Sequence, residues 1–246
     1  MKWYKVLYGK IRYYLARRKW KPQSAPIYCY YGEYADQLNE VKDHVQLYHV
    51  VPWGQDQAKK ISECKEVGLP VMYSPANLDP DRLREDFLYL RTLGLLEQIK
   101  FLYPCDEPNF NPPPNIRQVK SVAAEFPELR NVKYAVIYAG TNQNWIDLHE
   151  YDYVGIDSYD RQEHVLNLDM LDLRKALLTN QKMILVPGGA SPYHNDPRPF
   201  FKRALEDDKV GMVCAFAWFD PSVPDKTFSA GIRSNGMKSL YENGIK

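Results

Sequence analysis

The feature that most constrains the fold of this chain is a short apolar segment that recurs eight times. Each copy is rich in Val, Ile and Tyr, as expected of a β-strand buried on both faces. The spacing is about 26 residues, and segments with the period of an amphipathic helix fill the intervals. We expect strands to begin near Ile27, Val45, Leu69, Ile99, Val132, Tyr151, Lys182 and Val210.

Eight strand–helix units in one chain predict an α/β protein, a single (β/α)₈ TIM barrel over residues 26–246. The alternative is a doubly wound open sheet, which normally has a glycine-rich phosphate loop after its first strand. Here that strand ends Tyr31-Gly32-Glu33-Tyr34, without such a loop. The clearest helices are expected at Gln55–Val67, Asp79–Leu96, Ile116–Phe126, Leu168–Thr179, Pro199–Glu206 and Ser234–Glu242, and weaker ones at 33–42 and 142–149.

Residues 1–25 are predicted to form a basic amphipathic N-terminal helix and a proline-containing linker. The first 21 residues carry a charge of +8, which leaves −7 on the other 225 residues of a chain whose net charge is +1. Such a helix is suited to an anionic membrane surface or an acidic protein partner. The alternative is a helix that closes the bottom of the barrel. The apolar stripe consists of Trp3, Val6, Leu7, Ile11, Tyr14 and Leu15.

Composition excludes several other classes of protein. Apolar residues at 45% and charged residues at 26% are typical of a soluble globular chain, and a net charge of +1 argues against a nucleic-acid partner. No apolar run approaches the ~18 residues of a spanning helix. The first residues lack the apolar core of a standard secretory signal. We therefore expect synthesis in the cytoplasm, with association at a membrane surface or virion through residues 1–21.

The cysteines and histidines do not indicate a metal site or a cofactor. Cys29, Cys64, Cys105 and Cys214 form no closely spaced cluster, so we interpret them as reduced core residues. The five histidines contain neither an HxH nor an HExxH motif. A zinc hydrolase is thus not expected, and no metal or cofactor is predicted.

The strand ends indicate where chemistry would occur, because a (β/α)₈ barrel has its active site at the carboxyl ends of its strands. Carboxylates and aromatic rings gather at these positions, a composition typical of a sugar site. The residues singled out are Tyr103, Asp106, Glu107, Tyr138, Asp157, Tyr159, Trp218 and Asp220, with His49 and Trp53 after the second strand.

The pair Asp106-Glu107 at the fourth strand end is the sharpest of these features. Two adjacent carboxylates repel each other when both are charged, so one is expected to hold a proton near neutral pH. A protonated Glu107 would be a general acid. The alternative is an aspartate that caps the next helix, with the glutamate in solvent.

Asp157 ends the sixth expected strand. Strand alternation places Gly155, Asp157 and Tyr159 on the inward face, with Val154 and Ile156 toward the helices. An inward carboxylate near the mouth suits function better than core packing. A helix cap or an ion pair with a buried arginine is the alternative.

The aromatic candidates have alternatives of the same kind. Trp218, Tyr103, Tyr138 and Trp53 would each offer a flat face to a sugar ring, or would simply pack at the end of the barrel. His49 would enter the site or stay in solvent.

The segment Phe101-Leu-Tyr-Pro-Cys-Asp106-Glu107-Pro108 resembles the fourth-strand Asp-Glu-Pro motif of glycoside hydrolase family 123, and family 20 has a similar pair. The resemblance covers the motif and the barrel rhythm. It implies a substrate-assisted retaining glycosidase that acts on amino-sugar glycans. By this resemblance Glu107 protonates the glycosidic oxygen, Asp106 orients the 2-acetamido group, and Tyr159 is the candidate to bind the acetamido oxygen.

One departure keeps other mechanisms open. The seventh strand ends Pro187-Gly188-Gly189, without the glutamate nucleophile of many retaining barrels. Asp106 or Asp157 is left as the second carboxylate, and the separation of Glu107 from Asp157 would distinguish an inverting from a conventional retaining couple.

A second class of function is a non-catalytic carbohydrate-binding barrel within a larger assembly, such as a virion or a surface complex. A lyase or aldolase is less favoured because no lysine lies at a strand end.

Overall fold

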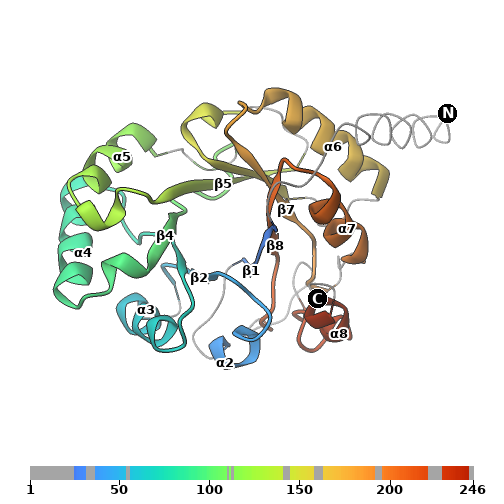
Figure 1. Ribbon diagram of the computed structural model, residues 1–246, viewed down its shortest axis with the longest axis horizontal. Coiled ribbons are helices and arrows are strands. Elements are labelled where there is room, and N and C mark those ends of the chain that lie inside the picture. Colours follow the sequence, from blue (N-terminus) through green and yellow to red (C-terminus); the bar gives the residue numbers. More distant parts are fainter. Residues whose placement is uncertain are drawn as a thin grey trace.

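The computed structural model describes residues 25–31, 37–53, 56–109, 111, 114–140, 145–157, 163–191, 196–220 and 229–243. Eight parallel strands follow the order β1-β8-β7-β6-β5-β4-β3-β2, and helices surround them in sequence order (Figure 1). The predicted (β/α)₈ barrel is therefore confirmed. The strands are β1 (Ile27–Tyr30), β2 (Tyr48–Val50), β3 (Val71–Tyr73), β4 (Ile99–Leu102), β5 (Lys133–Ala139), β6 (Tyr153–Asp157), β7 (Lys182–Val186) and β8 (Val210–Ala215).

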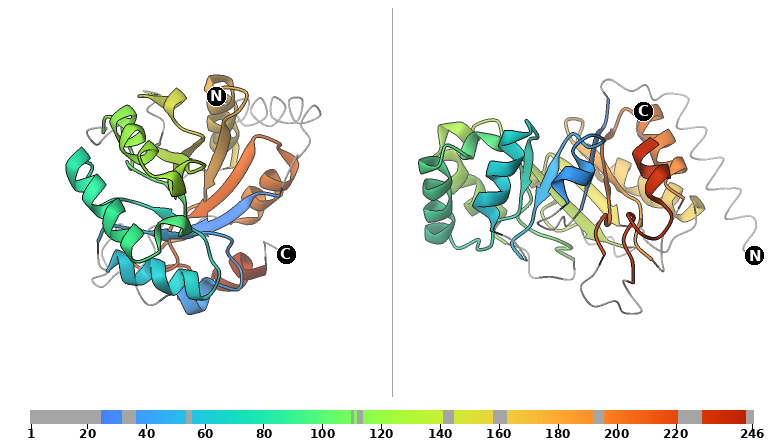
Figure 2. Two further views of the ribbon diagram at one scale, coloured as in Figure 1. Left: turned by 60° about the vertical axis from the view of Figure 1, so that its left-hand side comes forward. Right: turned by 90° about the horizontal axis from the view of Figure 1, so that it is seen from below.

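Helices cover the outside of the barrel, with α3 to α5 on one flank and α6 to α8 on the other (Figure 2). The α-helices are α2 (Leu38–Val41), α3 (Gln57–Glu66), α4 (Pro80–Thr92), α5 (Ile116–Ala124), α6 (Glu163–Ala176), α7 (Arg198–Glu206) and α8 (Lys238–Asn243). Short 3₁₀ turns are η1 (Leu96–Gln98), η2 (Pro127–Leu129) and η3 (Leu148–Glu150).

Local sequence accounts for the clearest helix starts. The side chains of Asp56, Asp79 and Asn115 accept backbone N–H bonds at the first turns of α3, α4 and α5. The two weaker expectations are realised only as short elements. The described part of 33–42 contains one helical turn, α2, and the described part of 142–149 contributes only to the 3₁₀ turn η3.

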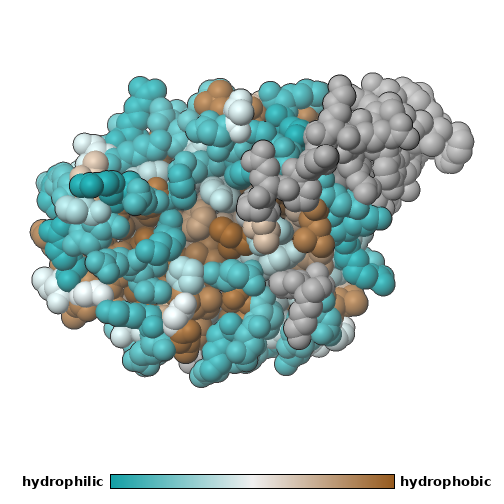
Figure 3. All heavy atoms as spheres, in the orientation of Figure 1, coloured by the Kyte–Doolittle hydropathy of each residue, from teal (hydrophilic) through white to brown (hydrophobic). Residues whose placement is uncertain are grey.

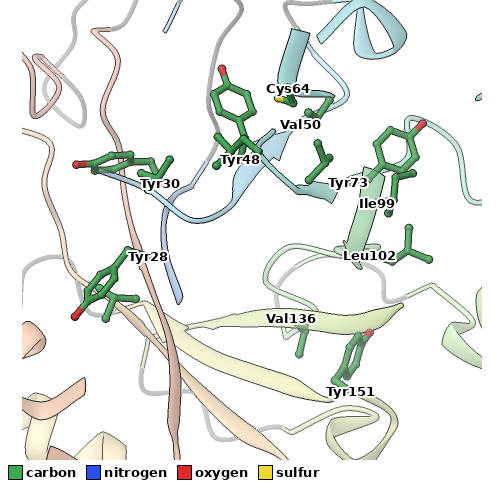
Figure 4. Packing of buried hydrophobic residues seen from close by; sticks show 14 of the residues in the cluster. Tyr28, Tyr30, Tyr48, Val50, Cys64, Tyr73, Ile99, Leu102, Val136 and Tyr151 are labelled. Atoms are coloured by element: carbon green, nitrogen blue, oxygen red, sulfur yellow. The ribbon is translucent and has the colours of Figure 1, made fainter. Parts of the chain in front are cut away.

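Two apolar layers hold the barrel together, and strand alternation assigns each side chain to one of them. Inward residues fill the barrel, among them Cys29, Met72, Phe101, Ile184 and Cys214. Outward residues pack against the helices, and Figure 4 shows members of this outer layer such as Tyr30, Tyr48 and Tyr151. All four cysteines are buried with free thiols.

The barrel has one weak seam, between β1 and β2, where the ladder of paired strands is interrupted. Gln46 bridges this seam twice. Its backbone N–H donates to the carbonyl of Tyr28 over 2.9 Å, and its side-chain Oε1 accepts from the Tyr28 N–H over 2.9 Å. A side chain thus supplies a bond that a strand neighbour would otherwise make.

Residues 1–24, which include the predicted basic helix, lie outside the described residues. None of the helices in the part of the chain that the structure describes is long and apolar enough to cross a membrane. On the face shown in Figure 3, hydrophilic side chains cover most of the described surface, and hydrophobic ones are visible near its centre.

Candidate active site at the carboxyl ends of the strands

The chain after β4 runs alongside β5 again at the candidate acid. Asp106 forms an isolated parallel bridge with Ile137, and the Glu107 N–H donates to the Ile137 carbonyl over 2.9 Å. Glu107 has φ of 48°, a left-handed conformation that is uncommon for a residue with a side chain. Such outliers cluster at functional sites because the surrounding contacts must hold them in place.

Two asparagine side chains provide these contacts. Asn109 donates from Nδ2 to the Ala139 carbonyl over 2.9 Å and accepts the Ala139 N–H at Oδ1 over 3.0 Å. The Asn111 side chain donates to the Asp106 carbonyl over 2.9 Å, and the backbone N–H of Asn111 donates to the Glu107 carbonyl over 2.9 Å. The loop that carries the acid is therefore fixed to β5 and to itself.

Glu107 meets a second carboxyl group across the mouth. Its side chain is hydrogen-bonded to that of Asp157, the last residue of β6. Burial and this contact with Asp157 raise the pKa of Glu107 from 4.5 to about 7. Asp157 is only 7% exposed, and its Oδ1 accepts the Gly140 N–H over 3.0 Å. Glu107 thus keeps a proton near neutral pH.

The raised pKa of Glu107 agrees with the sequence prediction, but its cause differs. The prediction relied on repulsion between Asp106 and Glu107. That repulsion contributes to the raised pKa of Asp106, whereas the pKa of Glu107 is raised by burial and by Asp157. The Asp106 side chain is bonded by tyrosine hydroxyls, and the Glu107 side chain is bonded to Asp157. The two acidic side chains of the dipeptide therefore have different partners.

Asp106 is bound by tyrosines. Tyr103 donates from its hydroxyl to Asp106 Oδ1 over 2.7 Å, and the Tyr31 hydroxyl also bonds this carboxylate. Burial raises the pKa of Asp106, and the bonds from Tyr31 and Tyr103 oppose that shift. Carboxylates have about four acceptor positions, so Asp106 retains capacity for a further donor.

His49 packs against the two tyrosines that bond this carboxylate. Its ring is 5.2 Å from both the Tyr31 and the Tyr103 ring centroids, and its Nε2 is 2.8 Å from Ser74 Oγ. Burial lowers the pKa of His49 to about 3, so its imidazole is neutral at pH 7. The alternative of a solvated loop histidine does not hold, because His49 is buried within β2.

Other predicted site residues lie elsewhere. Trp218 and Tyr138 are both fully buried in the outer layer, where Trp218 donates to Glu40 and Tyr138 to the Ile146 carbonyl. Neither ring has a free face for a sugar. Asp220 accepts hydrogen bonds from the Gly231 N–H and from the side chains of Arg233 and Ser234. These bonds connect the segment after β8 to residues 231–234.

Trp53 and Tyr159 are the remaining aromatic residues that were predicted for the site. Trp53, which follows β2, is 46% exposed and keeps an accessible ring. Tyr159 lies outside the described residues.

Sequence reasoning does not identify Phe216, and it places Tyr31 and Asn109 at strand ends without selecting them as site residues. The ring of Phe216 is part-exposed and lies 5.8 Å from that of Tyr31. Alternation along β8 would have found it, because Met212, Cys214 and Phe216 have the same parity. The strand ends at Ala215, so this pattern does not continue to Trp218. No comparable signal in the sequence identifies Asn109.

Buried and part-buried carboxyl groups thus lie with aromatic rings at the carboxyl end of the barrel, the end at which barrel enzymes have their active sites. No group of three or more His, Cys, Asp or Glu side chains suited to a metal ion occurs among the residues that the structure describes. No protein-family model matches the chain, and no curated protein does.

Solved structures do match, and several are of glycoside hydrolases. A family 17 β-1,3-glucanosyltransferase from Rhizomucor miehei has 13% identity and a TM-score of 0.57, over 84% of this chain and 92% of that one. β-Glucuronidase 2 of Bacteroides uniformis has 11% identity and a TM-score of 0.55, over 86% of this chain and 32% of that one. A family 2 β-galacturonidase from Eisenbergiella tayi has 12% identity and a TM-score of 0.54, over 84% and 47%.

These similarities establish a barrel fold shared with glycoside hydrolases. They do not single out family 123 or family 20. The chain spans about a third of the length of the B. uniformis enzyme.

Proposed function

We propose that this protein is a glycoside hydrolase in which Glu107 is the general acid. The observation that carries the proposal is the contact between Glu107 and Asp157, which together with burial raises the pKa of Glu107 to about 7. A carboxyl group that is protonated at neutral pH can donate to a glycosidic oxygen, and the resulting carboxylate can then accept a proton from water.

We further propose that the nucleophile comes from the substrate, a glycan that contains 2-acetamido sugars. The carboxyl groups of conventional couples are about 5–5.5 Å apart in retaining and about 6.5–9.5 Å apart in inverting enzymes. Glu107 and Asp157 are hydrogen-bonded, which is closer than either couple. This contact supports attack by a group of the substrate rather than by either carboxyl group.

In this mechanism the acetamido oxygen attacks the anomeric carbon as the bond to the leaving oxygen breaks. Glu107 transfers its proton to that leaving oxygen. Water then adds to the anomeric carbon of the cyclised intermediate as the bond from that carbon to the acetamido oxygen breaks, and the Glu107 carboxylate takes the proton from water. Asp106, anchored by Tyr31 and Tyr103, is proposed to orient the acetamido group through its remaining acceptor capacity.

The test compares the parent protein with Glu107→Gln on two pairs of substrates. We expect Glu107→Gln to reduce kcat on a natural amino-sugar glycan by roughly 10²–10⁴-fold. An aryl glycoside with a good leaving group should be affected less, because it needs little protonation. The parent should cleave the 2-acetamido aryl glycoside and leave its 2-hydroxy counterpart almost intact.

Glu85→Gln is the matched control, because Glu85 lies on α4 with its side chain 63% exposed. An unchanged rate in Glu107→Gln would refute the assignment of the acid. Cleavage of both aryl glycosides would refute substrate assistance alone. Sugar binding without turnover by the parent would instead favour a non-catalytic carbohydrate-binding barrel.

A further inference from the structure

The contact between Glu107 and Asp157 joins two segments that the strand ladder alone does not hold together. β4 ends at Leu102, five residues before Glu107, and Asp157 is the last residue of β6. Between them lies β5, whose final residue Ala139 is the register partner of Asp157. The position of Glu107 relative to Asp157 therefore depends on how the loop after β4 is attached to the end of β5.

Asn109 makes that attachment. Its amide accepts from the N–H and donates to the carbonyl of Ala139, over 3.0 and 2.9 Å, so it engages both polar groups of one strand residue. The next residue, Gly140, donates its N–H to Asp157 Oδ1 over 3.0 Å. A continuous chain of hydrogen bonds and backbone thus runs from Asn109, through Ala139 and Gly140, to the Asp157 carboxyl group that Glu107 contacts.

The neighbouring bonds do not duplicate this path. The Glu107 N–H bonds the Ile137 carbonyl, which fixes the start of the loop, and Asn111 bonds only backbone groups of Asp106 and Glu107. Without Asn109, the left-handed conformation of Glu107 would have one fewer restraint to β5. Glu107 would then relax away from Asp157.

We propose that Asn109 is a positioning residue that holds the Glu107 carboxyl group against Asp157 by tying the loop after β4 to the end of β5. This inference rests on the proposed function for its catalytic consequence and on geometry alone for its effect on Glu107. The ionisable groups described as interacting with Glu107 are Asp157 from β6 and Asp106 from its own segment. Among the contacts described for Glu107, its side chain is hydrogen-bonded to Asp157, and its backbone groups bond Ile137 and Asn111.

The experiment measures the pKa of Glu107 from its ¹³C side-chain carboxyl resonance in the full-length parent protein and in Asn109→Ala. We expect the pKa of Glu107 to fall by about one unit or more in the variant, because the contact that favours its protonated form is lost. With an active parent, kcat should fall about 10–100-fold with little change in KM, and the alkaline limb of the pH profile should move to lower pH.

Asn115→Ala is the matched control. Asn115 lies in the same connection and caps α5 by accepting the Gln118 N–H, so its loss lowers stability without touching the mouth. The pKa of Glu107 and the pH profile should be unchanged in this control. Asn109→Ser, which keeps a polar group but is too short to bond both groups of Ala139, serves if the alanine variant does not fold.

An unchanged pKa of Glu107 in the folded Asn109 variant would overturn the proposal, as would an equal shift in Asn115→Ala. A lowered pKa in a protein that cleaves no glycan would support the positioning role and refute the proposed hydrolase. The two hypotheses therefore fail separately.

Discussion

The contact between Glu107 and Asp157 favours the protonated form of Glu107 and lowers the stability of the folded protein when Glu107 is ionised. Burial and the contact with Asp157 raise the pKa of Glu107 from 4.5 to about 7. A carboxyl group with a raised pKa in the folded state binds its proton more tightly there than in the unfolded chain. Its contribution to stability is therefore full below pH 4.5 and is lost as the pH rises toward 7. Active sites commonly show such an exchange of stability for function.

At pH 8, Glu107→Gln should be more stable than the parent by about 1–2 kcal/mol, a figure reduced for solvent screening at this half-buried group. At pH 3.5 the difference should nearly disappear, because Glu107 is then mostly protonated in both the folded and the unfolded state. Urea unfolding at the two pH values measures both free energies. Asp207, whose pKa burial raises to about 6, is present in both proteins, so its effect cancels. A stability difference that does not change with pH would contradict this account of Glu107.

The strands nearest the site also meet at the weakest point of the barrel. β1 leads to Tyr31 and β2 contains His49, whose rings lie 5.2 Å apart inside the mouth. The seam between these strands is bridged by Gln46, whose backbone and side chain both bond Tyr28. The packing of Tyr31 on His49 therefore depends on few hydrogen bonds.

Gln46→Ala should destabilise the protein by about 1 kcal/mol, because the Tyr28 N–H loses its acceptor. Hydrogen exchange at the Tyr28 amide should become faster, while amides of β5 and β6 keep their rates. Gln98→Ala is the matched control. The Gln98 side chain donates to the Leu69 carbonyl, with a bond length of 2.7 Å, at a place away from the seam. Equal protection of Tyr28 in the parent and in Gln46→Ala would show that the seam does not depend on this side chain.

Charge is distributed unevenly over the whole molecule. Residues 1–21 carry +8 and the remaining 225 residues carry −7. We propose that the basic segment attaches the barrel to an anionic membrane surface or to an acidic partner. Attraction to an anionic membrane contributes about 1 kcal/mol per basic residue near the surface and is screened by salt.

The intact chain should therefore bind vesicles containing phosphatidylserine at low salt, and a shortened chain that begins at Pro26 should not. Flotation with the vesicles measures binding, and vesicles of phosphatidylcholine alone are the control. The shortened chain should remain folded, because the first strand begins at Ile27. Loss of folding on shortening, without vesicle binding by the intact chain, would indicate a helix that closes the barrel.

The sequence by itself determined the barrel and most of its strand positions. Eight apolar segments with helical segments between them specify parallel strands, and alternation within each strand specifies which residues face inward. Gly155 illustrates this, because a side chain there would meet Ile137 and Ile184 inside the barrel. The same reasoning placed Asp157 inward and Val154 outward, as the structure shows.

Only the tertiary structure decided which side chains meet. Glu107 and Asp157 are fifty residues apart and come together because β4, β5 and β6 are neighbours in the sheet. Trp218 and Tyr138 lie outside the mouth because packing, rather than residue type, decides which aromatic ring remains accessible. The role of Asn109 is invisible in the sequence, since its partner is the backbone of Ala139. Backbone partners leave no trace in residue type, and for this physical reason local patterns predict the fold better than the site.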